Sequence, residues 1–467
     1  MRSRFAEGFW GRMGSALGGA GMMLFPLNAG AETLQEAVET VLQQHDRIHA
    51  ARSDLDAAGA RKDQVLRATF TPTVTMTSHV GHERQSSQTS GPDTDMTSRE
   101  LDLAVKQLLF DFGKGLADVE VQDKQRQQMQ AALENVNQTL ILDAVTSFLN
   151  LNRATKVLDF AKKSVANIRH QGEVESARVT LGKGYSTDVL QAKAQLAGAE
   201  ARQVQSRGIL LRSEDHARTV FLREPREVVG LVPPDESLVV LPKTMDEALQ
   251  SAIATNPQLH QLAALVDGLD AAHRSARIGG FLPTVNGVWE YKMKNDVSGV
   301  DGFERENFVK AELAFPFNMG LASVSSVRAA ERDLAAARNR YNDTLLLVQE
   351  QVRTSWHNLE TSRENAELLT TQATLAEKFL EQAKEERAMD KRTLLDVLNG
   401  ETALINAQSD ALSAATDVRI ASYSVLQAMG TLTTEVLRPG VAGKLSTASS
   451  GKPGNVPETK KKNQKAL

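Results

Sequence analysis

Apolar positions follow a helical period over much of this chain. Between residues 321 and 389 they return every seven residues with no proline or glycine between them, which predicts a very long helix of the coiled-coil type. The segment 116–179 contains no proline and a single glycine, Gly172, and a helix of that length would span about 95 Å at 1.5 Å per residue. The predicted seam of the later helix consists of Leu345, Val352, Leu359, Ala366, Ala373 and Leu380.

Ahead of each long helix the period changes to two. In the first such segment Val74, Met76 and Val80 share one face and threonines share the other, as in a strand with one apolar and one polar face. Four strands are predicted in this way, at about 73–80, 101–106, 285–293 and 308–315. Polar loops are expected at 83–98 and 294–306. A shorter antiparallel helix is expected after each long one, over about 186–222 and 393–429.

The chain contains its own pattern twice. Residues 33–74 align with residues 244–285 without a gap, at a constant offset of 211 residues. Identical pairs include Glu36/Glu247, His49/His260, Phe70/Phe281, Pro72/Pro283 and Val74/Val285. A period of about 200 residues is too long for a solenoid. Each half is therefore predicted to be a first helix (about 34–68 in the first half, stopped by Pro72), two strands, a long helix and its partner.

These patterns divide the chain into five parts. Basic residues precede a small and apolar run that ends at Ala29-Gly30-Ala31, so residues 1–31 are predicted to be a cleaved signal peptide. The first repeat then covers 32–222 and the second 244–437. Prolines at 225, 233, 234 and 242 predict an irregular connector over 223–243. Residues 438–467 are polar and are expected to form a disordered tail.

The composition argues against several classes of function and site. The formal charge is −4 and no stripe of basic residues is present, which argues against a nucleic-acid partner. The absence of cysteine excludes disulfides, thiolate metal sites and a lipid attached to an N-terminal cysteine. Beyond the signal peptide there is no apolar run of the length that a membrane-spanning helix needs. The mature protein is therefore expected in the periplasm, outside the cell, or in an outer membrane as a barrel.

Enzyme motifs are weak in this sequence. His45 and His49 have the i, i+4 spacing of helical metal ligands, but the glutamate of the metalloprotease motif is missing and a solvated helix face is the preferred interpretation. Gly113-Lys114-Gly115 and Gly182-Lys183-Gly184 do not complete a phosphate-binding pattern. Gly113 is expected to ease a strand-to-helix transition, while Gly182 and Gly184 are expected to supply positive φ at a tight turn. No catalytic residue, metal site or cofactor is predicted.

Four amphipathic strands cannot close a barrel, and open sheet edges do not persist in hydrocarbon. Either the strands form a soluble hairpin structure, or several chains combine their strands. Three chains would supply twelve strands, an even number within the range of known barrels. The long helices would then continue that barrel as a tube. The sequence thus predicts a mainly α protein with a β-barrel part, built as an oligomeric conduit.

The sequence also resembles a known family. The duplication, the Phe-x-Pro-x-Val that ends the first helix, the Leu-Phe-Asp at 109–111 and the two helix-to-helix turns at 181–190 and 392–398 are similar to TolC-like outer-membrane efflux proteins. The resemblance covers about 33–437. It implies a homotrimer with a twelve-stranded barrel in outer-membrane lipid and a periplasmic α-helical barrel. It also implies a periplasmic adaptor and an inner-membrane transporter of the ABC or RND type as partners, in drug efflux or type I secretion.

The resemblance assigns roles to the two turns, which we call the tips. The tips would dock the adaptor through Leu181, Gly182, Gly184, Tyr185, Ser186, Met389, Arg392 and Thr393. The periplasmic aperture would be lined by Thr187, Asp188, Arg392, Asp396 and Asn399. Arg392 would hold the gate shut by bonding to Asp188 and Thr187, and Asp396 would form a cation-attracting ring. The alternative is that the docking residues only build tight turns, and that the gate residues form an ordinary helix-end salt bridge with a carboxylate N-cap at Asp188 or Asp396.

Two positions depart from the family pattern. Asp390 stands near the usual glycine of the second tip, and Asn399 stands where a second acidic residue is frequent. A different class of function also stays open at this point, namely a periplasmic coiled-coil adaptor or structural protein without a barrel. It would explain the heptads but not the amphipathic strands. The sequence does not specify the cargo.

Overall fold

The computed structural model describes residues 32–86, 94–235, 239–317 and 319–439 of the 467-residue chain. The predicted signal peptide, and the predicted tail from residue 440 on, lie outside the described residues. The first repeat comprises two helices, two strands and two further helices: α1 (Leu34–Gln44), α2 (Asp46–Phe70), β1 (Thr73–Gln85), β2 (Thr94–Phe110), α3 (Lys114–Thr180) and α4 (Ser186–Phe221).

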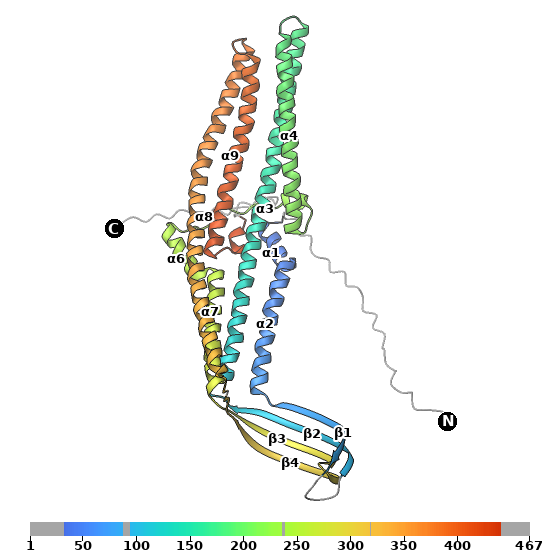
Figure 1. The fold of residues 1–467 in the computed structure, drawn as a ribbon. Coiled ribbons are helices and arrows are strands. Elements are labelled where there is room, and N and C mark those ends of the chain that lie inside the picture. Colours follow the sequence, from blue (N-terminus) through green and yellow to red (C-terminus); the bar gives the residue numbers. More distant parts are fainter. Residues whose placement is uncertain (1–31, 87–93, 236–238, 318, 440–467) are drawn as a thin grey trace, which may run out of the picture. The chain divides into compact units, whose positions relative to one another are not determined.

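The second repeat has the same order of elements. It comprises α6 (Met245–Thr255), α7 (Pro257–Phe281), β3 (Thr284–Val297), β4 (Val300–Ala314), α8 (Ala322–Ala388) and α9 (Leu394–Met429), followed by the 3-10 turn η2 (Thr434–Leu437). Figure 1 shows both long helices, α3 and α8, each folded back on its shorter partner. The long helices and their partners begin and end within two residues of the sequence-based expectation.

The first helix of each repeat is broken, and the prediction of one helix over 34–68 was wrong. His45 has extended backbone angles (φ −76°, ψ 130°) and its Nδ1 accepts a hydrogen bond from the backbone N–H of Arg47. Asn256, at the equivalent position of the second repeat, has φ −68° and ψ 121° and caps α7 in the same way through Gln258. An N-cap residue has extended backbone angles, which a helix cannot continue through. The short helix therefore ends at this residue, and the longer helix begins after it.

The four strands form one antiparallel sheet in the order β1-β2-β3-β4. The strands are longer than expected, and half of the predicted loop at 83–98 and most of the one at 294–306 belong to them. The register confirms the predicted faces. Val74, Val105, Trp289 and Val309 are aligned in one row, and Thr77, Asp102, Lys292 and Glu306 are aligned in another. Because directly paired residues point to the same side, the sheet has one apolar and one polar face.

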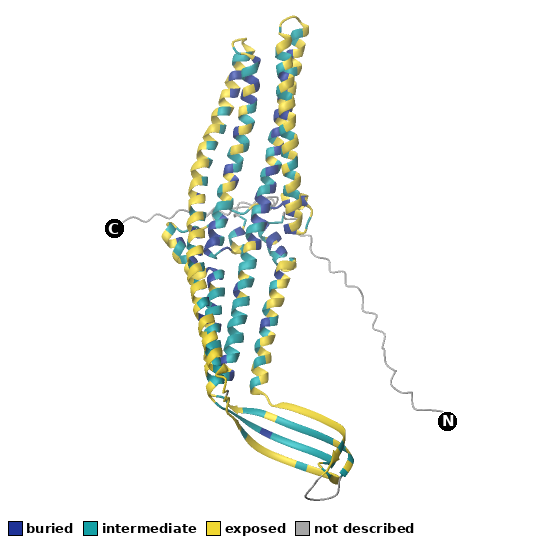
Figure 2. Cartoon of the chain, viewed as in Figure 1, coloured by how far each residue is buried: buried dark blue, intermediate teal, exposed yellow. Residues whose placement is uncertain are grey.

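Among the residues that the structure describes, β1 and β4 each pair with a strand on one side only. Figure 2 shows β1 and β4 as mainly exposed and the inner strands as mainly half-buried. The apolar face carries large exposed side chains as well, including Met76, Val80, Val309 and Leu313. Two open edges and an exposed apolar face are the features of a sheet that is completed by something else.

The helices next to the sheet repeat the order of the strands. Packing runs from α2 to α3, from α3 to α7 and from α7 to α8, and these helices are connected directly to β1, β2, β3 and β4. On the other side of the helix breaks the order is α4, α3, α9 and α8. The layer of helices therefore has two open edges, as the sheet has.

The main apolar core lies where α1 meets the middle of α3, the end of α4 and the connector. Leu34, Phe148 and Phe221 are fully buried there. A second cluster joins α6, α7, α8 and α9, and it includes Val352 and Leu359 of the predicted seam, which is confirmed as the less exposed side of α8. Each helix break thus allows a short helix to fill a core beside a long one.

The connector is more ordered than its prolines suggested. Pro225 begins a short helix, α5 (Pro225–Val229), because proline at the first helical position costs no hydrogen bond. Further on, Val232 pairs with Thr33 in a parallel bridge. The bridge fixes the connector to the start of the first repeat. The expectation of an irregular connector over 223–243 was wrong at residues 225–229, which form α5.

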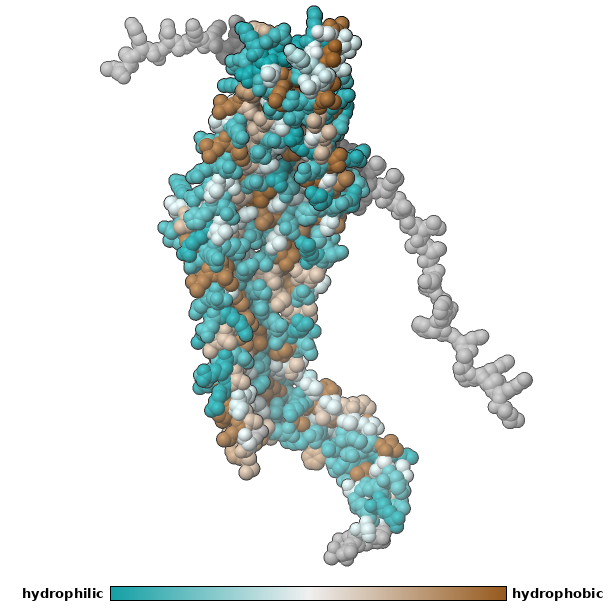
Figure 3. Space-filling view, turned by 45° about the horizontal axis from the view of Figure 1, so that its top comes forward, coloured by the Kyte–Doolittle hydropathy of each residue, from teal (hydrophilic) through white to brown (hydrophobic). Residues whose placement is uncertain are grey.

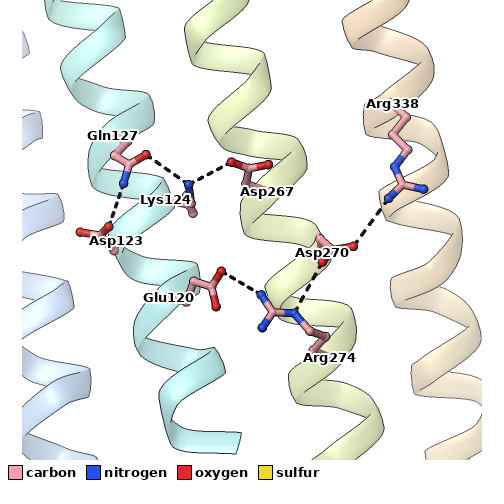
Figure 4. A network of polar contacts seen from close by, with 8 residues as sticks. All are labelled: Glu120, Asp123, Lys124, Gln127, Asp267, Asp270, Arg274 and Arg338. Carbon is pink, nitrogen blue, oxygen red and sulfur yellow. Dashed lines mark hydrogen bonds and ion pairs between the residues drawn. The ribbon is translucent and has the colours of Figure 1, made fainter. Parts of the chain in front are cut away.

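Ion pairs link neighbouring helices of the α2-α3-α7-α8 layer (Figure 4). Lys124 of α3 bonds Asp267 of α7 at 2.9 Å, and Arg274 of α7 bonds Glu120 of α3 at 2.8 Å. Arg338 of α8 lies 3.6 Å from Asp270 of α7. The pairing with Glu120 raises the pKa of the Arg274 guanidinium. Such pairs fix the register of the helices more than they stabilise the fold, because partly exposed pairs contribute little.

One further pair joins α2 to the same layer. Lys62 Nζ lies 2.8 Å from Asp123 Oδ1. The hydrogen bond from Lys62 holds the pKa of the Asp123 carboxyl below its usual value, against a smaller opposing effect of burial. The carboxylate therefore stays ionised to lower pH than a free one.

Candidate functional site: the two tips

The two tips have the same backbone design. At the end of α3 the N–H of Gly182 donates to the carbonyl of Val179 and the N–H of Lys183 donates to that of Arg178. At the end of α8 the N–H of Asp390 donates to Arg387 and that of Lys391 donates to Glu386. This pair of bonds is the Schellman arrangement, which places one residue in the left-handed region.

That left-handed residue differs between the tips. Gly182 has φ +71° and Asp390 has φ +55°. Glycine adopts this conformation without cost, whereas a residue with a Cβ is strained by about 1 kcal/mol or more. Asp390 therefore occupies the place of the glycine that the family pattern has, with an unfavourable backbone.

Gly184 is required for a different reason than expected. Its φ is not positive, so the prediction that it supplies a left-handed residue was wrong. A Cβ at this position would lie 2.9 Å from the carboxylate of Glu175 and 3.2 Å from the backbone nitrogen of Val179. Any other residue at 184 would force the Glu175 carboxylate and the end of α3 to shift, so glycine is favoured at this close approach.

The remaining docking candidates are at the surface of the tips. Leu181 is 73% exposed, Tyr185 is 76% exposed and Met389 is 56% exposed. Ser186 and Thr187 are exposed in the first turn of α4. Nothing in the fold of one chain requires a large apolar side chain at these exposed positions, in contrast to the two glycines.

One of the two helices that start at the tips has a side-chain cap, and neither Asp188 nor Asp396 is its N-cap: the N-cap of α9 is Thr393, and that of α4 is Tyr185, which makes no side-chain cap bond. Thr393 caps α9: its hydroxyl accepts from the N–H of Asp396 at 3.2 Å and lies 2.8 Å from the Asp396 carboxylate. The N–H of Asp188 bonds the carbonyl of Tyr185 in the first turn of α4. The capping interpretation thus accounts for the type of residue at 393 and 396, while leaving the Asp396 carboxylate half-buried and free to accept further bonds.

Within one chain, Arg392 contacts its own tip. Its Nε lies 2.7 Å from Glu386 Oε2, and its guanidinium lies over the ring of Phe379, 5.3 Å from the centroid. In the described part of the chain it makes no bond to Asp188 or Thr187. Across the tips, Asn399 instead accepts a hydrogen bond from Gln195 of α4 at 3.4 Å.

At the tips, the buried carboxylate of Glu175 joins the first helical hairpin, α3 and α4, to the second, α8 and α9. Arg387 Nη2 at the end of α8 donates to Glu175 Oε2 of α3 at 3.0 Å, and its Nη1 donates to the carbonyl of Arg392 at 3.1 Å. The Glu175 side chain is only 4% exposed. Arg178 of α3 lies 3.5 Å from Asp390. We call the Glu175–Arg387 pair, with the Arg178–Asp390 pair, the tip latch.

A second connection lies further from the tips. The Glu401 carboxylate of α9, also 4% exposed, bonds Lys384 of α8 at 2.6 Å and accepts from Asn167 of α3 at 3.3 Å. Sequence reasoning missed Glu175, Arg387, Lys384 and Glu401. The available signal was a charged residue on the inner side of a helix, but the contacts Glu175–Arg387 and Asn167–Glu401 join residues more than 200 positions apart, and only the fold reveals them.

The motifs considered for enzymes have structural roles. His45 is the N-cap of α2, so it does not share a continuous helix face with His49. Gly113 has φ +89° at the start of α3, which confirms its role in the strand-to-helix transition. Among the described residues, no helix is both long enough and apolar enough to cross a membrane.

Comparison with known proteins shows to which family a chain of this architecture belongs. The family model described as "Outer membrane efflux protein" matches residues 37–216 and 248–431, one match for each repeat. The chain belongs to the outer membrane efflux protein family. The two matched ranges agree with the two repeats of the fold.

Curated relatives of this family match over nearly the whole chain. The outer membrane efflux protein BepC of Brucella suis is 24% identical over 433 residues, which is 91% of each chain. The outer membrane protein TolC of Escherichia coli is 24% identical over 453 residues, covering 93% of this chain and 89% of TolC. The alkaline protease secretion protein AprF of Pseudomonas aeruginosa is 24% identical and covers 85% of this chain and 84% of AprF.

Solved structures of outer-membrane channels have the same fold. The outer-membrane channel OprN superposes with a TM-score of 0.74 at 20% identity, covering 85% of this chain and 90% of OprN. The CmeC outer membrane channel of Campylobacter jejuni superposes with a TM-score of 0.73 at 13% identity, covering 86% and 87%. An outer-membrane efflux or secretion channel is therefore the supported function, in preference to an adaptor without a barrel.

Proposed function

We propose that this chain is the outer-membrane export channel of a tripartite efflux or type I secretion system, working as a homotrimer. The observation that carries the proposal is the matching order of strands and helices, with an open edge on each side. β1 and α2 lie at one edge, and β4 and α8 lie at the other. Pairing β4 of one copy with β1 of the next would remove every open strand edge from the bilayer.

Unpartnered apolar stripes on the edge helices support this assembly. On α4, Leu190, Val204 and Leu211 are each more than half exposed and lie in one heptad series with Ala197. On α8, Leu347, Leu368 and Leu375 form another exposed heptad series. Figure 3 shows apolar side chains reaching the surface of the helical part between hydrophilic ones. Such stripes are the seams of coiled coils, and a neighbouring copy would cover them.

The two faces of the sheet fit a barrel around a polar channel. Val74, Val105, Trp289 and Val309 would face lipid in one row. The opposite face carries ion pairs such as Lys310–Glu290 and Lys294–Glu306, both at 2.7 Å, and would line the lumen. Alternation of this kind is typical of transmembrane barrels with an aqueous interior.

The tips would form the periplasmic aperture. Three copies of Asp396 around a narrow opening would attract cations. Each pair of these carboxylates would repel by about 3 kcal/mol at 6 Å and an effective dielectric constant of 20. Asn399 in place of a second acidic residue would make this preference weaker than in family members with two acidic rings. The tip latch would resist the separation of the two hairpins that opening requires.

The exposed apolar residues of the tips suit a docking surface. Leu181, Tyr185 and Met389 offer large side chains that the fold of one chain leaves uncovered, and aromatic and methionine residues are enriched in interfaces. A periplasmic adaptor is the proposed partner, connecting the channel to an inner-membrane transporter. The energy for export would come from that transporter.

Subunit number and location test this proposal together. Outer-membrane fractions would be extracted in mild detergent, and the mass of the purified complex would be measured by native mass spectrometry. Three chains per complex, with inter-chain crosslinks between cysteines placed on β1 and β4, are expected. A monomer that stays soluble without detergent would refute the channel and would support a periplasmic adaptor.

A further inference from the structure

The polar face of the sheet carries a cluster of three side chains suited to metal binding. His79 of β1 is paired directly with Glu100 of β2, and Asp102 lies two residues further along β2 on the same face. One ligand atom from each of the three residues lies within 4.8 Å of the other two. One imidazole nitrogen and two carboxylate oxygens form a mixed donor set that suits borderline divalent cations such as Zn²⁺.

A second observation points to a missing ligand at this cluster. Asp102 Oδ1 is buried from solvent and has no hydrogen-bond partner in the described part of the chain. An ionised oxygen buried without a partner is costly, and such atoms in folded proteins commonly bind water or an ion. The sheet therefore already holds one carboxylate oxygen in a position that favours a cation.

In the described part of the chain no lysine forms an ion pair with this cluster. Lys294, opposite Glu100, bonds Glu306 on β4 at 2.7 Å and interacts with Glu100 through its charge alone. Lys292 lies opposite Asp102 on β3, and no ion pair joins the two. Lys292 should therefore compete with a metal ion through its charge without replacing it as a ligand.

We propose that His79, Glu100 and Asp102 form a binding site for one divalent transition-metal cation per chain. The three residues hold the ion on two neighbouring strands, and water completes its coordination. In the proposed barrel the site would lie in the lumen, so this placement rests on the proposed function. Metal binding itself does not, because it needs only the pairing of β1 with β2 within one chain.

Titration of the purified full-length protein with ZnCl₂ tests the site. Metal-free protein in detergent would be titrated by calorimetry in competition with a chelator of known affinity. One Zn²⁺ per chain is expected, and His79→Ala or Asp102→Asn should each weaken binding at least 10- to 100-fold, roughly the loss seen when groups that support metal ligands are removed. Lys292→Met should tighten binding.

His82 provides a matched control. It lies on the same strand but on the opposite face, and its Nε2 is 2.9 Å from Asp95, a single carboxylate. His82→Ala should leave the stoichiometry and affinity unchanged. Absence of Zn²⁺ binding to the folded wild-type protein, or equal loss in the His82 and His79 variants, would overturn the site. Conductance measured on the same samples separates this outcome from a failure of the channel itself.

Discussion

Arg387 on α8 donates a hydrogen bond to the buried carboxylate of Glu175 on α3 across 3.0 Å. The two residues lie on different helical hairpins and are 212 positions apart in the chain. Their pairing is the most buried ionic contact between the two tips, so it is the strongest candidate for the contact that opens when the aperture opens.

Arg387→Ala should destabilise the closed tips. The substitution leaves the Glu175 carboxylate buried without its cation, at a cost on the order of 2–4 kcal/mol. We expect larger conductance in planar bilayers and greater sensitivity of cells to bulky antibiotics. The exchange of charges, Glu175→Arg with Arg387→Glu, should restore part of the closed behaviour.

The conductance of Arg392→Ala should be compared with that of Arg387→Ala, which lacks the Glu175–Arg387 pair of the tip latch. Within one chain Arg392→Ala removes a contact to Glu386 and the Phe379 ring, both on α8, so it should raise conductance less than Arg387→Ala does. If Arg392→Ala and Asp188→Ala have the larger effect, the gate is held by the Arg392–Asp188 contact between neighbouring copies, and the latch is structural.

Asp390→Gly should stabilise the second tip. Glycine removes the strain of a left-handed residue, about 1 kcal/mol, and the lost contact to Arg178 is weak because the Asp390 side chain is 80% exposed. Slower hydrogen exchange of the amides at 389–393 is the expected result. Asp390→Asn separates the two effects, since it removes the charge and keeps a residue that tolerates this conformation. Faster exchange in the glycine variant would show that the pair with Arg178 dominates.

Val204→Glu should weaken the assembly. A carboxylate in the centre of the exposed stripe on α4 would be buried against a neighbouring chain without a partner. Native mass spectrometry should show monomers of the variant, whereas the proposed assembly predicts trimers of the wild type. Val204→Leu keeps the position apolar and should leave trimers intact. Trimers of normal stability in the glutamate variant would place the interface elsewhere.

The Lys62–Asp123 pair predicts a pH-dependent contribution to stability. Because the pKa of Asp123 is lowered in the folded protein, the contribution is complete above the usual carboxyl pKa, about 3.9, and disappears as the pH falls through the lower folded value. Lys62→Met should therefore cost about 0.2–1 kcal/mol at pH 7. The difference in melting temperature from wild type should vanish at a pH well below the folded pKa of Asp123. A difference that persists there would indicate lost packing of the lysine stem.

The sequence predicted the features that depend on local periodicity. The long helices, the faces of the strands and the partner helices have periods of 3.5 or 2 residues, which short windows reveal. The break at His45 was missed because histidine is an uncommon cap, although Pro257 next to Asn256 in the second repeat is a typical first helical residue and would have indicated it. The ends of the strands were missed because they continue through polar residues beyond the apolar band.

The candidate site was predictable only in part. The left-handed glycine of the first tip follows from the turn, so Gly182 was found from the sequence, whereas the cap of α9 was expected at Asp396 and is Thr393. The latch requires Glu175 and Arg387 to meet across two hairpins, and no local pattern encodes that contact. For Tyr185 the structure shows an exposed side chain, as docking requires. Whether it docks depends on the surface of the partner, which this sequence does not contain.

Planar-bilayer recording of the purified wild-type protein tests the central claim most directly. Trimers extracted from outer membranes should insert and give uniform conductance steps with a preference for cations, and Asp396→Ala should lower that preference. If folded trimers insert and conduct no ions, in wild type and in Arg387→Ala alike, the protein is not an export channel.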